Sequence, residues 1–146
     1  MKTAALDRLD LADPEQAGVY FVTDADLRGL ARAGHAGGLQ VVLLDLHGVR
    51  GKPQLLERLA GALQFPDPER GRNWDALSDR LRDLSWLPAS GYLLLIADAR
   101  ALREADAPAF DTFLDILDEA AADWAAAGTP FWAFLALPEE EFGADA

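Results

Sequence analysis

The chain contains no cysteine among its 146 residues. This absence excludes a disulfide framework and a cysteine-based zinc site, and it fits a reducing compartment. No apolar stretch reaches the roughly 18 residues of a membrane-spanning helix, and the charged start, with Asp7 and Arg8, holds no signal-peptide core. We therefore expect a cytoplasmic protein that binds no membrane, and at this length one domain can bury its own core.

Basic residues are also scarce, with 13 lysines and arginines against 25 aspartates and glutamates and a formal net charge of −12. Affinity for nucleic acids comes largely from lysine and arginine on phosphate groups, so this balance argues against a nucleic-acid partner. It favours a basic protein as the partner. Acidic charge also keeps proteins soluble, so only the placement of the carboxylates can decide between these two interpretations.

Several catalytic motifs are missing. A nucleophilic triad needs an activated serine or cysteine beside a histidine, but the chain has only two histidines and no Gly-x-Ser-x-Gly motif. A phosphate-binding loop is missing as well, because the glycines between Gly34 and Gly38 precede an expected strand rather than a helix. The sequence therefore predicts no cofactor.

One set of residues leaves an enzymatic alternative open. Asp45 and His47 follow one expected strand, and Asp98 follows another. Neighbouring parallel strands bring such ends to one crevice, where two carboxylates and an imidazole can hold a divalent ion for hydrolysis. Polar residues also end strands simply where the chain enters water, and His47 with Gly48 is typical of a turn.

Three continuous apolar runs predict the core strands of a sheet. They occupy residues 40–46, 92–97 and 129–135. The first run is typical of a central strand that is covered on both faces. The expected helices begin at Pro53, after Asn73 and at Ala107, and the first and last of them end before Pro66 and Gly128. Strands that alternate with helices pair in parallel, so we expect an α/β fold: a small parallel sheet of three core strands packed with helices.

The first part of the chain is predicted to extend this core. Residues 19–22 are typical of a short strand, and a helix follows from Thr23 or Asp24 and ends at Gly34. The expected division of the chain is an N-terminal extension packed on the same domain (1–39), an α/β domain (40–137) and an acidic tail without an assigned role (138–146). We expect a monomer, although an open edge strand of the extension offers a place where two copies can pair.

The run from Gly71 to Leu84 predicts a capped helix with one apolar and one solvent-facing side. Asn73 precedes the first periodic residue, where its side-chain oxygen can accept from an orphan backbone N–H. The apolar positions follow one stripe, and they are Trp74, Leu77, Leu81 and Leu84. The opposite side carries Asp75, Asp79, Arg82 and Asp83. A rigid helix therefore presents carboxylates to solvent.

The same run resembles the signature of a known family. Gly71, Asn73, the segment Asp75-Ala76-Leu77 and Asp79 resemble the loop and second helix of the barstar family, and the order of elements is similar over residues 41–137. The resemblance implies a barstar-like fold and an intracellular inhibitor, an antitoxin or immunity protein, that plugs the active site of a basic ribonuclease. Its carboxylates would lie where the phosphates of the substrate bind, and Asp79 matches the central contact.

The resemblance also implies which residues contact the partner. They are Gly71, Arg72, Asn73, Asp75, Ser78, Asp79, Arg82, Glu119 and Asp123. Without the resemblance, the acidic side is simply a solvated helix face. On such a face Asp75 complements the positive end of the helix, and Asp79 pairs with Arg82 or Arg80.

Two departures from the family pattern leave a second class of partner open. Ser78 stands where the prototype has a tryptophan, and the loop before Gly71 lacks the aromatic residues of the prototype. The alternative is an interaction module of the same fold that binds a different basic protein. Trp86, beside Pro88, is expected to pack in a buried corner rather than to contact a partner.

Overall fold

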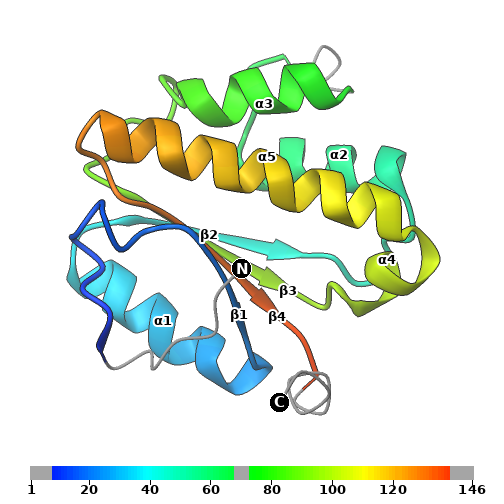
Figure 1. Cartoon of the computed structure of the whole chain (residues 1–146), viewed down its shortest axis with the longest axis horizontal. Helices are drawn as coiled ribbons and strands as arrows, with labels where there is room; N and C mark the ends of the chain where they lie inside the picture. The colour runs from blue at the N-terminus through cyan, green and yellow to red at the C-terminus, as the bar shows by residue number, and fades with distance from the viewer. Residues whose placement is uncertain (1–7, 68–72, 139–146) are drawn as a thin grey trace.

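The structure, a computed structural model, describes residues 8–67 and 73–138. Four strands form one sheet, and helices cover both of its faces (Figure 1). The strands are β1 (Val19–Val22), β2 (Gln40–Asp45), β3 (Tyr92–Ala97) and β4 (Phe131–Ala136). The helices are α1 (Asp24–Ala36), α2 (Lys52–Ala62), α3 (Trp74–Asp83), α4 (Arg100–Ala105) and α5 (Ala107–Ala126).

The strand order is β1-β4-β3-β2, and every neighbouring pair runs in parallel. This order confirms the expected α/β class, because β2, β3 and β4 carry the three apolar runs. It also confirms the added strand, since Val19 of β1 lies opposite Ala133 of β4. Parallel neighbours need long connections, and the helices between the strands supply them.

The sheet separates two hydrophobic cores. On one face, α2 to α5 cover a core that includes Leu44 and Leu135. On the other face, α1 and the segment before β1 cover Trp132 and Phe134, whose rings stack 5.6 Å apart. Figure 1 shows α1 on the opposite side of the sheet from α5. The indole N–H of Trp132 donates to the carbonyl oxygen of Leu11 at 2.9 Å, so the segment before β1 is tied to this second core.

Strand β2 lies at the edge of the sheet, with β3 as its neighbour on one side. Leu44 is buried against the helices, but Leu43 on the other face keeps 71% of its surface exposed. Helix α1 packs near Val41 and leaves Leu43 in solvent. The expectation of a central strand covered on both faces is therefore wrong. A continuous apolar run shows neither where its strand lies in the sheet nor how far a helix covers that strand.

Helix α1 is longer than expected, since it continues through Gly34 to Ala36. A Cβ atom at this glycine would lie 2.4 Å from the Cδ2 atom of Leu93 in β3. The glycine therefore lets the helix approach the sheet closely, and it does not end the helix. The end comes at Gly37, whose N–H donates to the carbonyl oxygen of Ala33 at 3.0 Å.

Helix α4 was not among the expected elements. It has six residues and follows Asp98, which adopts a positive φ of 58°. A helix of this length is too short to show a clear apolar period. The expected helices after Asn73 and from Ala107 are confirmed as α3 and α5. Within residues 8–67 and 73–138, no helix is both long and apolar enough to cross a membrane.

Candidate functional site

Helix α3 begins at a capped N-terminus, as its sequence predicts. The Oδ1 atom of Asn73 accepts a hydrogen bond from the backbone N–H of Ala76 at 2.7 Å. Leu77 and Leu81 are fully buried beneath the helix, and Trp74 is half-buried at its start. The cap and the buried stripe together hold α3 in one position, with its acidic side toward solvent.

Helix α3 is also fixed to α5. The indole N–H of Trp124, on α5, donates to the carbonyl oxygen of Leu81 at 2.8 Å. Leu84 ends α3 with a left-handed backbone at φ 49°, and its buried side chain joins the core beneath the helices. The two helices lie beside each other in Figure 1. They therefore form one rigid support for the side chains on their outer side.

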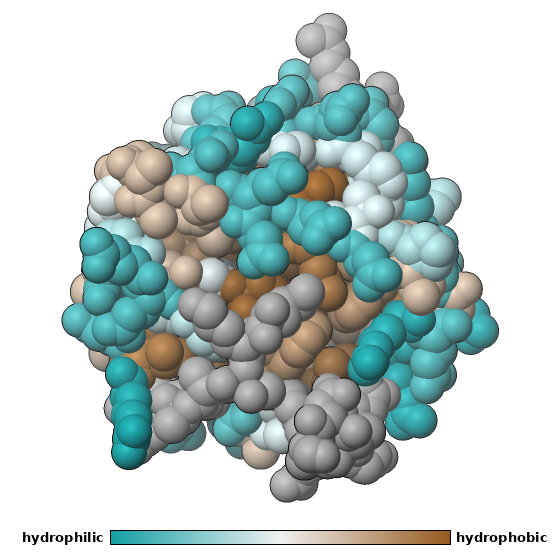
Figure 2. Space-filling view, viewed as in Figure 1, coloured by the Kyte–Doolittle hydropathy of each residue, from teal (hydrophilic) through white to brown (hydrophobic). Residues whose placement is uncertain are grey.

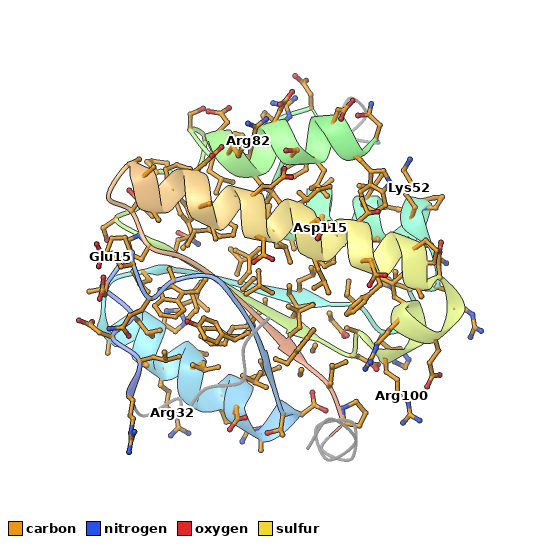
Figure 3. All side chains as sticks on the ribbon, in the orientation of Figure 1. Glu15, Arg32, Lys52, Arg82, Arg100 and Asp115 are labelled. Carbon is orange, nitrogen blue, oxygen red and sulfur yellow. The ribbon has the colours of Figure 1, made fainter. Side chains whose placement is uncertain are left out.

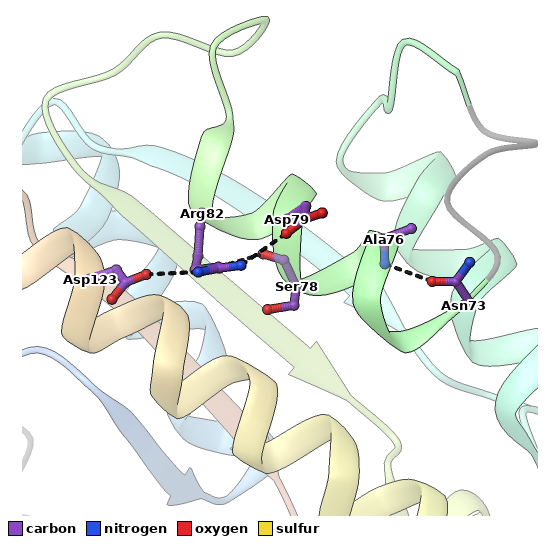
Figure 4. A network of polar contacts seen from close by, with 6 residues as sticks. All are labelled: Asn73, Ala76, Ser78, Asp79, Arg82 and Asp123. Atoms are coloured by element: carbon purple, nitrogen blue, oxygen red, sulfur yellow. Dashed lines mark hydrogen bonds and ion pairs between the residues drawn. The ribbon is translucent and has the colours of Figure 1, made fainter.

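An arginine joins the two helices on that outer side (Figure 4). The Nη2 atom of Arg82 lies 2.9 Å from Oδ1 of Asp79, and its Nη1 atom lies 3.5 Å from Oδ2 of Asp123 on α5. Its Nε–H donates to the carbonyl oxygen of Ser78 at 3.3 Å. The side chains stay accessible, with exposed fractions of 42% for Arg82, 75% for Asp79 and 56% for Asp123. The structure thus brings these four expected contact residues together on one surface.

The other expected contact residues lie outside this network. Asp75 is exposed in the first turn of α3, where it complements the positive end of the helix. Glu119 is exposed on α5, four residues before Asp123. In the part of the chain that the structure describes, neither Asp75 nor Glu119 forms an ion pair. Gly71 and Arg72 lie outside the described residues.

The outer side of α5 continues the negative charge. Its exposed carboxylates are Asp111, Asp115, Asp118, Glu119 and Asp123. They recur about once per turn, and Figure 3 labels Asp115 among them. Figure 2 shows hydrophilic side chains over α3 and the neighbouring part of α5. We refer to the outer side of these two helices, with Asp75, Asp79, Glu119 and Asp123, as the acidic surface.

A family model for barstar, described as the barnase inhibitor, matches residues 39–136. The chain belongs to the barstar family. The match covers more than half of the chain and includes β2, β3 and β4 with α2 to α5, while β1 and α1 precede it. It confirms the resemblance carried by the run from Gly71 to Asp79. Comparison with curated proteins gave no match.

The contacts of two side chains beside the acidic surface of this barstar-family chain could not be predicted from the sequence. Trp124 holds α5 to α3, and the ammonium group of Lys52, from α2, lies 5.3 Å from the ring centre of Trp74. Lys52 and Trp74 line a hollow of about 230 Å³ together with Asp106 and Thr112. An amphipathic pattern shows that a residue faces a core, but it does not show which helix that residue contacts.

Trp86 packs in a corner, as expected for this barstar-family chain. Its indole N–H donates to the carbonyl oxygen of Leu63 at 2.9 Å. The guanidinium of Arg80 lies 5.8 Å from the Trp86 ring centre and 3.8 Å from Oδ2 of Asp67. Arg80 thus makes its contacts away from the acidic surface. Of the two arginines expected as partners of Asp79, it is Arg82 that pairs with it.

The residues of the enzymatic alternative also lie together, where β2 and β3 end. Nδ1 of His47 lies 2.7 Å from Oδ2 of Asp98, and Oδ1 of Asp45 accepts from the backbone N–H of His47 at 2.9 Å. The His47 side chain is 82% exposed. Among the residues that the structure describes, no three histidine, cysteine or carboxylate side chains are placed to hold a metal ion. Asp45 ends β2 and His47 lies in the turn that follows it, while Asp98 belongs to the loop after β3, so the hydrogen bond between His47 and Asp98 joins two loops.

Proposed function

We propose that this chain is an inhibitor of a basic ribonuclease, or of another nuclease toxin, and that it covers the active site of that enzyme. It acts in the cytoplasm as an antitoxin or immunity protein, binds its partner as a monomer and catalyses no reaction itself. The family match supports this role, because the matching model is that of the barnase inhibitor. The net charge of −12 supports a basic protein, rather than a nucleic acid, as the partner.

The observation that carries the proposal is the pair of carboxylates that Arg82 holds together, Asp79 from α3 and Asp123 from α5. The active site of a ribonuclease concentrates positive charge to stabilise the phosphate in the transition state. Carboxylates on rigid helices can occupy such a pocket without offering a bond to cut. Their preorganisation also avoids the entropy cost of ordering a flexible loop on binding.

The proposed contact set is wider than this pair. It includes Gly71, Arg72, Asn73, Asp75, Ser78 and Glu119 beside Asp79, Arg82 and Asp123. Asn73 contributes through the cap that positions α3. Exposed carboxylates attract a basic partner over distance, so association should slow as the salt concentration rises.

Inhibition of a panel of basic microbial ribonucleases tests the proposal. Asp79→Asn keeps the side-chain shape and removes the charge, and Asp24→Asn makes the same change on α1, across the sheet from the acidic surface. We expect the parent and Asp24→Asn to inhibit the same ribonuclease equally. Asp79→Asn should inhibit it about a hundredfold more weakly, because a desolvated cation of the enzyme loses its partner.

Two results would contradict the proposal. Equal inhibition by the parent and by Asp79→Asn would show that the contact lies elsewhere on the chain. Failure of the parent to inhibit any ribonuclease of the panel would favour the alternative, a module of the same fold that binds a different basic protein. Circular dichroism of each variant shows whether a loss of inhibition comes from a loss of folding.

A further inference from the structure

A second hollow, of about 210 Å³, lies between the segment that leads into β1 and the C-terminal half of α5. Its lining residues are Pro14, Glu15, Ala17, Gly18 and Val19 on one side and Asp118, Ala121, Ala122 and Ala125 on the other. The first side precedes residues 39–136, the part of the chain that matches the barstar family model. The family match therefore carries no information on this hollow, which exists only because the N-terminal extension lies beside α5.

The floor of the hollow is apolar. Val19 and Ala121 are buried there, and the side chains of Pro14, Ala17 and Ala125 extend the apolar lining. The alanines of α5 have short side chains, so they leave room between the helix and the extension. An aliphatic chain of a ligand can lie on such a floor and exclude water from it.

Two carboxylates line the same hollow, one from each side. Glu15 belongs to the segment before β1, where Figure 3 labels it, and Asp118 belongs to α5. Both residues are exposed. Among the residues that the structure describes, neither carboxylate forms an ion pair with a cation of the chain. The hollow thus combines an apolar floor with two negative charges, and a ligand that complements both has an aliphatic part and a cationic end.

Hydrogen bonds hold the side of the hollow that the extension forms. The backbone N–H of Glu15 donates to Oδ1 of Asp13 at 2.9 Å, and Nε2 of Gln16 donates to Oδ2 of Asp13 at 3.1 Å. Oε1 of Gln16 accepts from the backbone N–H of Asp10 at 3.0 Å. The backbone that carries Glu15 is therefore ordered before a ligand arrives, which lowers the entropy cost of binding.

We propose that this hollow binds a lysine or arginine side chain of a basic protein. The aliphatic stem of that side chain lies on the alanines of α5, and its cationic end pairs with Glu15 and Asp118. Exposed ion pairs are weak by themselves, so a free amine is held poorly. A whole basic protein is attracted in addition by the neighbouring exposed carboxylates of α5, such as Asp115. The inference does not require this protein to be a nuclease.

A titration followed by nuclear magnetic resonance of the ¹⁵N-labelled chain tests the inference. The probes are the Nα-acetyl N-methylamide derivatives of lysine, arginine and norleucine, added at constant ionic strength. Norleucine has the stem of lysine without the ammonium group. We expect the lysine and arginine probes to shift the amide signals of Ala17, Gly18, Ala121 and Ala122, with half-saturation at about 1–10 mM. The norleucine probe should cause no saturable shift of these signals.

Two double variants with the same change of charge show which carboxylates bind the probes. Glu15→Gln with Asp118→Asn removes both carboxylates of the hollow. Glu57→Gln with Asp115→Asn makes the same two changes at exposed residues outside the lining. We expect the first double variant to bind the lysine probe at least tenfold more weakly than the parent, and the second to bind it within about twofold of the parent.

Two single variants test the apolar part of the hollow without changing its charge. Ala122→Leu places a larger side chain in the lining, and Ala126→Leu adds the same side chain one turn later on α5, outside the lining. Both alanines are exposed, so the helix tolerates either change. We expect Ala122→Leu to weaken binding of the lysine probe at least fivefold and Ala126→Leu to leave it unchanged.

Three results would overturn the inference. Equal weakening in both double variants would show that the probes bind through the net charge of −12 rather than in the hollow. Binding of the norleucine probe as tight as that of the lysine probe would show that the hollow selects an apolar group. The same conclusion against the inference follows if neither cationic probe causes a saturable shift. The spectrum of each variant shows that it is folded before it is titrated.

Discussion

The indole nitrogen of Trp124 lies 2.8 Å from the carbonyl oxygen of Leu81, and this bond joins the last turn of α5 to the last turn of α3. Asp79 and Asp123 stand on these same two helices. A partner that binds both carboxylates needs them at a constant separation. We therefore predict that the bond between the helices contributes to recognition of the proposed partner as well as to stability.

Replacing Trp124 with Phe keeps a ring but removes the N–H donor. We expect the free energy of unfolding, measured with urea, to fall by about 1–3 kcal/mol, because the Leu81 carbonyl loses its indole partner. Partner affinity, measured by calorimetry, should fall several-fold. Trp86→Phe is the matched control, since it removes a 2.9 Å bond to Leu63 away from the acidic surface. A similar loss of affinity in both variants would contradict the prediction.

Stability should fall in alkaline solution because of Tyr92. Burial raises the pKa of Tyr92 above its ordinary value of 10.0. A backbone hydrogen bond at Ala89 opposes this effect in part, and the charge of Asp83 raises the pKa by a smaller amount. The folded state thus holds the phenolic proton more tightly than the unfolded chain does. The resulting stabilisation is complete below pH 10 and is lost as the pH rises through the raised pKa.

Denaturation at pH 8 and above pH 10 measures this effect. Tyr92→Phe removes the 2.7 Å bond to the carbonyl oxygen of Leu87, so it should cost about 1 kcal/mol at pH 8 and reduce the alkaline loss. Burial also raises the pKa of Tyr20, the other tyrosine of the chain. The double variant with Tyr20→Phe should therefore lose less stability at alkaline pH than either single variant. An unchanged alkaline loss in the double variant would contradict the assignment.

Two adjacent leucines of β2 should differ sharply in their contribution to stability. Leu44→Ala should lower the free energy of unfolding by about 2–5 kcal/mol, because it opens a cavity where the side chain is 2% exposed. Leu43→Ala should change it by less than about 0.5 kcal/mol, because that side chain is 71% exposed. Chemical denaturation of the two variants under one condition tests the contrast. Comparable losses would mean that Leu43 is covered in solution.

Helix α3 could be predicted with its first residue because the signals that define it are local. Asn73 caps it, and Trp74, Leu77 and Leu81 repeat with helical spacing. The pairing of Arg82 with Asp79 could also be predicted from the sequence, since residues three apart on a helix are neighbours. The family signature lies on the same residues, which explains why the candidate site was found together with its helix.

Features that depend on the packing of distant segments could not be predicted. The link from Arg82 to Asp123 joins residues 41 positions apart and exists only because α3 lies against α5. Gly34 looked like the end of a helix, but its role depends on Leu93 of β3. The edge position of β2 depends on the order of four strands, about which one apolar run carries no information.

We propose that the N-terminal extension (1–39), of which the structure describes residues 8–39, belongs to the same domain as the rest of the chain. Tyr20 of β1 stacks on Trp132 and Phe134 of β4, with ring centres 5.7 and 5.5 Å apart. Tyr20→Ala should therefore cost about 3–5 kcal/mol. Deletion of residues 1–38 should abolish cooperative unfolding and the near-ultraviolet circular dichroism signal. A truncated chain that keeps both would show that the extension is separable.

The outer edge of β2 affects how the protein behaves in concentrated solution. The N–H groups of Gln40 and Leu46 point toward β3, so those of Val41 and Leu43 point away from the sheet, where no strand of the described chain pairs with them. The strand contains neither proline nor lysine, which commonly block pairing between edges. At neutral pH the charge of −12 keeps copies apart. Near the isoelectric point of about 4.4 the net charge falls to zero, and we expect β2 to become a template on which one copy can extend the sheet of another.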